Sequence, residues 1–450
     1  MLGKQVVLRR TNNKEISVPI AKLSATDRQY LKDFKPSTSP NTDDKTAVAA
    51  VKKLGASVQQ DGQGNVIGLK LSGTKITDAG LVHLKGLTKL RTLNLLYTKI
   101  TDEGLEHLKG LTGLQNLSLN LTKITDAGLA HLKGMTELRS LNLGGKHGPG
   151  IGDPRSRSQI TDAGMIHLKE LTSLRNLNLT DTRVTAAGLV HLKGLTNLKV
   201  LTLSGTQITD ARLAHLKGMT NLQTLRLGGT SITDAGLVHL AALRLQRLNI
   251  PKQTQTDLGL KHYLAARGPQ RSLHLSRVGR TDVEWSVTDA GVVHLKGQVE
   301  LGTLNLRGTK VTDPGLLHLT GLSSLRTLML DDTEITDAGL VHLKGLTKLR
   351  TLNLANHKIT GFGLRSLQPQ IRREYLQIRS GQVTDAGLVH LNPLTELRSL
   401  NLRGSKVTDA GLAHLKGLTN LKSLDLRDTQ VTDAGVAELQ KALPNCKIRN

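Results

Sequence analysis

The sequence contains one cysteine, Cys446, among 450 residues. A single thiol cannot form an intramolecular disulfide, so the fold depends on no disulfide framework, and cysteine usage does not indicate an oxidising compartment. Cys446 lies in the motif Leu443-x-x-Cys446-x-Ile448, among apolar positions. We therefore predict a buried thiol with no metal or redox role.

Aromatic residues make up only 2% of the chain. Proteins that bind single-stranded nucleic acid without sequence preference stack the bases on aromatic side chains, and this sequence offers few such platforms. Long apolar runs are missing too: none reaches the ~18 residues of a membrane span, and Met1–Arg10 has no apolar core of a secretory signal. As written, the chain is expected to be soluble and cytoplasmic.

Motifs of catalysis are also missing. The patterns His-Glu-x-x-His, Gly-x-Ser-x-Gly and Cys-x-x-Cys do not occur. The glycine-rich run at 148–152 belongs to an insertion, and it is not a strand-to-helix phosphate loop followed by Lys and Ser or Thr. We predict a protein that is not an enzyme, with no catalytic residue and no cofactor.

What the sequence does contain is a repeat. Thr-Asp-Ala-Gly-Leu preceded by Ile or Val first occurs at 76–81 and returns along the chain, mostly at a spacing of 24. In the unit 87–110, the alternation around Leu93 and Leu95 is typical of a half-buried strand, and Leu105 and Leu108 are spaced as on one helix face. Each unit is predicted to form one strand and one helix, and neighbouring units must stack to bury their apolar faces. The seven apolar positions of this unit are Leu87, Leu90, Leu93, Leu95, Ile100, Leu105 and Leu108.

The pattern Leu-x-x-Leu-x-Leu-x-x-Thr-x-Ile-Thr-Asp-x-Gly-Leu recurs in fifteen copies over roughly 66–450, one of them degenerate near Gln255. It resembles the leucine-rich repeat family and looks closest to the bacterial and F-box-associated subclass. The cysteine usual in the F-box subclass is missing, so a ubiquitin-ligase role is not expected. The resemblance implies an α/β solenoid, a curved horseshoe with a parallel sheet on the concave side and short helices on the convex side. We predict a scaffold that binds a protein or peptide through the concave face and its rim loops.

Residues 1–34 do not fit the repeat and are predicted to form two strands and a helix. The run from Val6 to Leu31 resembles the second half of the SLA-one homology domain, a small barrel-like module that binds Asn-Pro-Phe peptides in endocytic adaptors. Its first strands are missing here, which suggests that the true start lies upstream; an exported protein is then the alternative to a cytoplasmic one. The other predicted segments are a linker at 35–42, an N-terminal cap at 43–71, the repeat array at 72–436 and a C-terminal cap at 437–450.

Several residue types recur in columns that have structural explanations. The threonines that leave each strand, such as Thr98, are expected to bond the backbone of adjacent coils. Asp78 and its equivalents are expected to cap helix N–H groups, and Gly104 and its equivalents to permit close approach of coils. A histidine column is expected to form an exposed, solvated stripe with no metal site, because parallel outward-pointing copies do not converge on one ion. Its members are His83, His107, His131, His167, His191, His215, His239, His262, His294, His318, His342, His390 and His414.

The chain carries 61 Lys and Arg against 36 Asp and Glu, a formal charge of +25. This excess is compatible with an anionic polymer or surface as partner, such as nucleic acid or an acidic polysaccharide. The repeat offers another cause, because the Lys that follows His-Leu, as at Lys85 and Lys109, multiplies one solvated helix position. We favour this second explanation and keep the anionic polymer as the alternative.

Candidate binding residues lie where the copies differ. Arg379, Arg403 and Arg427 form one column with Asp425 beside it, and guanidinium groups about 5 Å apart could grip an acidic partner. The other reading is a solvated face neutralised by Asp425 and Asp428, and the sequence leaves both open.

Two insertions, at 144–159 and 276–286, fall between strand and helix and should emerge on one rim. Candidates there are Arg155, Arg157 and Trp285, which is either an interface anchor or a cover for the degenerate repeat beside it. Tyr97 and Tyr375 are predicted on the concave strands. We expect a monomer that binds a protein or peptide partner, and we expect the partner to be acidic where it contacts the arginines.

Overall fold

A computed structural model describes residues 5–9, 15–19, 45–145, 158–276, 285–355, 358–367 and 374–450. The predicted linker, the short helix before it and most of both insertions lie outside the described residues. At the N-terminus, β1 (Gln5–Arg9) and β2 (Glu15–Pro19) pair antiparallel, with Gln5 opposite Pro19. These are the two strands predicted there.

The array begins with helix α2 (Lys45–Lys53) and the hairpin of β3 (Ser57–Gln60) and β4 (Val66–Lys70). Asp61 forms the turn: its Oδ1 accepts the N–H groups of Gln63 at 2.9 Å and Asn65 at 3.0 Å. The amide of Asn65 also bonds this carboxylate, and these contacts hold the pKa of Asp61 below its usual range. Gly64 follows at a φ of +84°, which favours glycine.

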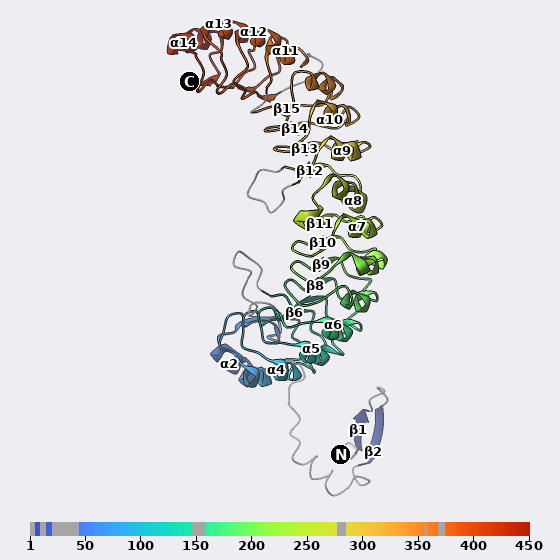
Figure 1. Cartoon of the computed structure of the whole chain (residues 1–450). Helices are drawn as coiled ribbons and strands as arrows, with labels where there is room; N and C mark the ends of the chain where they lie inside the picture. The colour runs from blue at the N-terminus through green and yellow to red at the C-terminus, as the bar shows by residue number, and fades with distance from the viewer. Residues whose placement is uncertain are drawn as a thin grey trace.

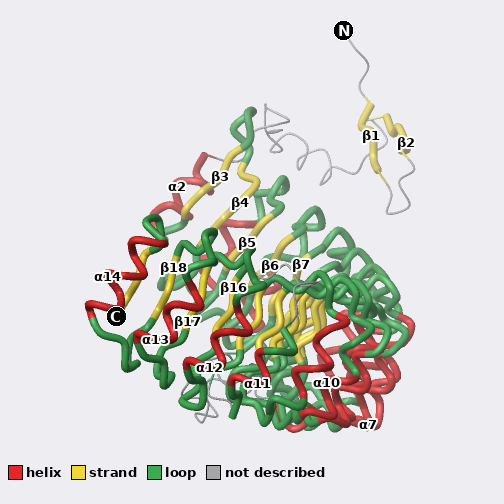
Figure 2. The backbone as a smooth tube through the Cα atoms, turned by 90° about the horizontal axis from the view of Figure 1, so that it is seen from above, coloured by secondary structure: helices red, strands yellow, loops and turns green. Residues whose placement is uncertain are grey.

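From β4 onward each unit contributes one short parallel strand (Figures 1 and 2). The central leucines are in register, so Leu93 lies opposite Leu117 and Leu69. The strands of the first part are β5 (Thr92–Asn94), β6 (Asn116–Ser118), β7 (Ser140–Asn142), β8 (Asn176–Asn178), β9 (Val200–Thr202), β10 (Thr224–Arg226) and β11 (Arg247–Asn249). Those of the second part are β12 (Ser272–His274), β13 (Thr303–Asn305), β14 (Thr327–Met329), β15 (Thr351–Asn353), β16 (Tyr375–Gln377), β17 (Ser399–Asn401), β18 (Ser423–Asp425) and β19 (Lys447–Arg449).

The other side of the array carries short helices, most of which continue into a 3₁₀ turn (Figure 1). Three units have only a 3₁₀ segment, at Gly188–Leu192, Asp210–Gly218 and Gly339–Gly345. The α-helices are α3 (Asp78–Leu81), α4 (Asp102–Glu106), α5 (Asp126–Leu129), α6 (Asp162–Met165), α7 (Asp234–Leu237), α8 (Asp257–Arg267), α9 (Asp289–Val292), α10 (Asp313–Leu317), α11 (Gly361–Leu364), α12 (Asp385–Leu388), α13 (Asp409–Leu412) and α14 (Asp433–Ala442). The predicted α/β leucine-rich repeat solenoid is confirmed.

The apolar side chains of successive copies form one continuous hydrophobic core between the sheet and the helices. All seven predicted positions of the unit 87–110 are at most 1% exposed, and one cluster of buried side chains extends from Ala47 to Cys446. Cys446 is buried, as predicted, and burial raises the pKa of its thiol to about 11.

The sheet, in contrast, is not continuous. A nine-stranded sheet ends at β11, and an eight-stranded sheet begins at β12, although the two strands are consecutive. The expectation of one sheet along the whole array is wrong at this point. The break coincides with α8, which has 11 residues where its neighbours α7 and α9 have four.

The threonines that leave the strands bond within their own coil. Thr98 Oγ1 donates to the carbonyl of Leu95 at 2.7 Å, and its equivalents do the same. The prediction that they link adjacent coils is wrong, because the turn brings the hydroxyl back onto the residue three positions earlier. The equivalent bonds are formed by Thr74, Thr122, Thr182, Thr206, Thr230, Thr309, Thr333 and Thr429.

The aspartates, in contrast, do link coils. Asp102 Oδ1 accepts the N–H of Thr125 at 2.8 Å, and its Oδ2 accepts the hydroxyl of the same residue at 2.5 Å. Asp102 is the first residue of α4, and its carboxylate was predicted to cap that helix. Instead it binds Thr125, the residue that precedes helix α5 of the next copy. A Cβ added to Gly128 would lie 2.2 Å from Asp102 Oδ1, which confirms that the glycine permits close approach of coils.

Candidate binding surface

The outward positions of each strand form columns across the sheet, while the leucines between them point into the core. In β5, for example, Leu93 is buried, whereas Thr92 is exposed and Asn94 is half-buried. Most members of the two strand columns are Thr, Ser or Asn, which are neutral and can donate or accept hydrogen bonds. The concave wall is therefore polar, and its composition changes from one copy to the next.

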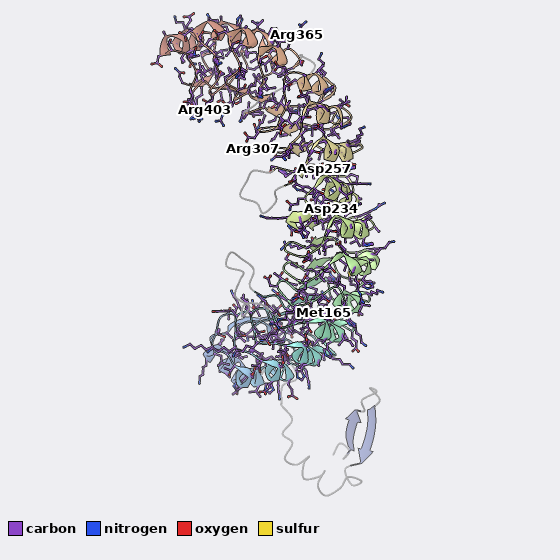
Figure 3. All side chains as sticks on the ribbon, in the orientation of Figure 1. Met165, Asp234, Asp257, Arg307, Arg365 and Arg403 are labelled. Atoms are coloured by element: carbon purple, nitrogen blue, oxygen red, sulfur yellow. The ribbon has the colours of Figure 1, made fainter. Side chains whose placement is uncertain are left out.

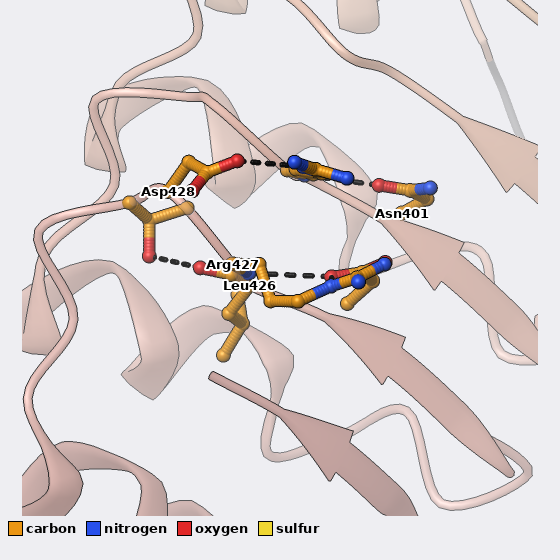
Figure 4. Close-up of polar contacts among 7 residues, drawn as sticks. Asn401, Leu426, Arg427 and Asp428 are labelled. Atoms are coloured by element: carbon orange, nitrogen blue, oxygen red, sulfur yellow. Dashed lines mark hydrogen bonds and ion pairs between the residues drawn. The ribbon is translucent and has the colours of Figure 1, made fainter.

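The arginine column lies just after the last three complete strands, and two of its members are paired within the chain. Arg427 bonds Asp425 through Nε–Oδ1 at 2.9 Å and Nη2–Oδ2 at 2.6 Å (Figure 4). Arg403 Nε lies 2.6 Å from Asp428 Oδ2. Asp425 is 8% exposed, and its bond with Arg427 lowers the pKa of its carboxyl. Asp425 and Asp428 thus neutralise these two arginines.

Arg379 differs from both. The Arg403–Asp428 pair spans 25 residues, and Arg307 makes the same contact with Asp332 at 3.2 Å. Figure 3 places Arg307 and Arg403 on the strand side of the array. The residue 25 positions after Arg379 is Gly404, and Arg379 is exposed with no carboxylate within salt-bridge distance among the described residues. Of the three arginines, Arg379 has the most freely available guanidinium.

The two candidate tyrosines occupy different places. Tyr375 is the first residue of β16 and is 48% exposed, so it lies on the concave face as predicted. Tyr97 lies three residues beyond β5, in the turn that leaves the strand, with a φ of +54°. The placement of Tyr97 on a strand is therefore wrong; it projects from the rim and is 70% exposed.

Trp285 is buried, with 3% of its surface exposed. Its ring meets Tyr263 of α8 edge to face, with centroids 5.4 Å apart. Of the two readings of this residue, the exposed anchor is wrong, because the side chain covers the degenerate repeat and belongs to the core. The rim candidates Arg155 and Arg157 lie outside the described residues.

The histidine column occupies one helical position, but only His83 and His239 are exposed, while the other members are half-buried. The prediction of a fully exposed stripe is therefore only partly right. Burial lowers the pKa of His215, His262 and His294, and nearby lysines act in the same direction. No group of three or more His, Cys, Asp or Glu side chains in the described part of the chain could hold a metal ion.

A cleft at the sheet break is a feature that the sequence analysis missed. A cavity of about 180 Å³ lies between β11 and β12, with Tyr263, Arg267 and Trp285 in its lining. A second cavity of about 210 Å³ lies beside it, over β10 and β11. Strand residues at the break, such as Asn249 and His274, are exposed, whereas Asn94 and Asn305, at the same column position elsewhere, are half-buried. The available signal was Pro251, which has no N–H at a position where other copies supply one.

None of the described helices combines the length and the apolar composition of a membrane span. Family models described as leucine rich repeat match residues 172–232, and also 86–109, 345–367, 394–415 and 417–439. These ranges lie within the array, so the resemblances of the N-terminal segment to the SLA-one homology domain and of the repeats to the F-box subclass stay predictions. No curated protein matches the chain.

Among solved structures, an internalin from Listeria monocytogenes is 23% identical, with 92% of this chain and 98% of that chain covered and a TM-score of 0.40. A leucine-rich repeat protein of Leptospira interrogans is 18% identical, with coverages of 82% and 80% and a TM-score of 0.41. The plant peptide hormone receptor RGFR1, solved in complex with RGF2, is 14% identical, with coverages of 87% and 74% and a TM-score of 0.44. The family models and the in-register parallel strands together show that the chain contains an array of leucine-rich repeats.

Proposed function

We propose that the chain is a non-enzymatic scaffold that binds a protein or peptide along its concave face and rim. The observation that carries this proposal is that buried and outward residues alternate along each strand. Leucines fill the buried strand positions in every copy and form the core. The outward positions carry different side chains from copy to copy, and these do not contribute to the core. Such a surface can change its specificity at little cost in stability.

Three exposed side chains make this surface suitable for protein recognition. Arg379 offers a guanidinium that no carboxylate of the described residues pairs with, and Tyr375 lies four residues before it on the same coil. Tyr97 projects from the rim at the other end of the array. Arginine and tyrosine are enriched among the residues that dominate binding energy at protein interfaces, and arginine grips carboxylates in a bidentate geometry.

The test is photo-crosslinking from defined faces of the full chain. A photoreactive amino acid is placed at Thr351 or Ser399 on the concave strands, and at Lys109 or Lys344 on the exposed convex positions as matched controls. After irradiation in a lysate of the source organism, we expect one protein to be captured from the concave positions only. Changing Arg379 to Glu should reduce this capture, whereas Arg91→Glu, outside the column, should not.

A salt series separates this proposal from the anionic-polymer alternative. Affinity for a polyanion falls steeply with salt, because binding releases the condensed counterions. Capture from the concave positions should therefore persist at a salt concentration that abolishes binding to a heparin column. Equal capture from both faces, lost in parallel with heparin binding, would favour the alternative.

A further inference from the structure

The break between β11 and β12 leaves backbone groups of both strands without partners. In a regular step, Leu227 N–H donates to the carbonyl of Asn249 at 2.8 Å, and Arg247 N–H donates to that of Gln223 at 3.0 Å. The equivalents across the break join Ile250 to His274 and Ser272 to Gln246, and neither bond forms between these described strands. The edges of β11 and β12 that face each other therefore do not pair. Exposed strand edges of this kind pair readily with another chain.

Arg267 takes the place of β12 at one of these groups. From the end of α8, its Nη2 donates to the carbonyl of Gln246 at 2.7 Å, the acceptor that β12 would otherwise use. Its Nη1 bonds the hydroxyl of Tyr263 at 2.6 Å. The Nε of Arg267 is buried and has no hydrogen-bond partner among the described residues. The guanidinium of Arg267 thus lines the cleft with its Nε–H unsatisfied by any described residue.

The size of the cleft limits what can occupy it. The cavities of about 180 and 210 Å³ are smaller than the roughly 300 to 1,000 Å³ of typical small-molecule pockets. They suit one or two side chains of a segment whose main chain lies along the strands. Because the groups that line the break include unpaired strand edges, an extended main chain fits their chemistry better than a helix does.

The charge of the lining selects the side chain. Arg226, Arg247 and Arg267 line the two cavities, and no aspartate or glutamate is among the lining residues. Three guanidinium groups with no carboxylate beside them among the described lining residues favour an acidic ligand. Nucleic acid fits less well, because Trp285 is buried and its ring packs against Tyr263, so it offers no open face for a base.

We propose that the break binds one extended, acidic segment of a protein partner, whose main chain pairs with the free edges of β11 and β12 and whose carboxylate meets Arg247 and Arg267. This inference rests on the proposed binding function and assigns it a second site, away from Arg379.

The binding test uses the full chain and a fluorescein-labelled octapeptide, Thr-Val-Thr-Asp-Val-Thr-Val-Thr. We expect saturable binding by fluorescence anisotropy, weakened at least tenfold when Asp is replaced by Asn or when alternate peptide nitrogens are methylated. Arg247→Gln should weaken binding about tenfold, the equivalent of about 1.4 kcal/mol. Arg326→Gln, an exposed arginine away from the break, is the matched control and should have no effect. Equal binding of the methylated peptide, or equal losses in the two variants, would overturn the proposal.

Hydrogen exchange locates the bound segment. The amides of Ile250 and Ser272 should exchange faster than those of Leu227 and Thr303 in the free protein, and the peptide should protect them. Protection elsewhere, or none, contradicts the proposal, as does protection that rises with protein concentration alone, which would indicate a second copy in the break. If the peptide fails while crosslinking from the concave positions still captures a partner, only this inference is lost.

Discussion

The carboxylate of Asp78 holds Thr101 of the next coil by two hydrogen bonds, from the backbone N–H at 2.9 Å and from the hydroxyl at 2.7 Å. Asp78 also fills the space above Gly104, where an added Cβ would lie 2.3 Å from its Oδ1. The Thr-Asp-x-Gly motif thus forms a contact between successive copies. The Asp of one copy accepts hydrogen bonds from the Thr of the next copy and packs against its Gly. Figure 3 shows Asp234 and Asp257, two later members of this series, in neighbouring coils.

Removing the threonine should cost stability only where an aspartate holds it. Thr125 bonds Asp102, whereas the copy before Thr209 carries Ala186 in place of Asp, and Thr209 has no such bond. We expect Thr125→Ala to destabilise its coils by about 1 to 2 kcal/mol and Thr209→Ala to cost much less. Hydrogen exchange of the adjacent coils measures both, because unfolding of a solenoid need not be two-state. Equal effects would show that the bond to Asp contributes little.

The fit of glycine against aspartate predicts strong coupling between them. Gly128→Ala should destabilise the array, because the new Cβ would overlap the Asp102 carboxylate. In the Asp102→Ala background the same change should be nearly harmless, with a coupling energy of about 1 to 3 kcal/mol in a double-mutant cycle. The chain contains a natural version of this pair: where Ala186 replaces Asp, Arg212 replaces the next Gly. Ala186→Asp should therefore be tolerated only together with Arg212→Gly, and additive effects would contradict this reading.

The phase of the array was predictable because leucines recur at fixed spacing and every copy repeats the same evidence of burial. The role of Asp102 was not, because helix capping and a bond to the next coil place the carboxylate at the same sequence position. Only the joint loss of Asp and Gly at Ala186 and Arg212 distinguishes them in the sequence.

The sheet break escaped prediction for a different reason. Leu248 and Leu273 keep their inward positions on either side of it, so the apolar pattern is intact. What changes is a backbone donor: Asn94 Oδ1 accepts the N–H two residues later at 3.0 Å, but Pro251 has none, and Asn249 turns instead to the N–H of Gly228 at 2.9 Å. Hydrophobic periodicity does not report such a change.

We expect Tyr97 to contribute to partner binding while lowering the unfolding free energy of the array. Its φ of +54° is typical of glycine, and glycine occupies the equivalent turn at Gly73 and Gly205. Left-handed backbone costs an ordinary residue roughly 1 to 2 kcal/mol, partly offset by the entropy that glycine loses on folding. Tyr97→Gly is therefore expected to raise the unfolding free energy by up to about 1 kcal/mol while reducing concave-face capture. A variant that loses stability, or one that binds undiminished, contradicts the assignment of Tyr97 to the interface.

Acid should loosen the array through its half-buried histidines. Burial, aided by Lys261, lowers the pKa of His262 and His294 below 6.5, so the unfolded chain binds protons before the folded chain does. Stability contributed by the neutral rings is then complete above about pH 6.5 and declines as the pH falls towards their folded pKa values.

Denaturant midpoints measured between about pH 7 and pH 5 should therefore fall, and the double variant His262→Gln, His294→Gln should flatten that part of the profile. His83→Gln is the matched control, because this ring is exposed at the same helical position. Protonation of all 16 histidines would also raise the formal charge from +25 to +41, and this repulsion should weaken with added salt. A slope abolished by salt but unchanged in the double variant would assign the acid response to net charge and not to the buried rings.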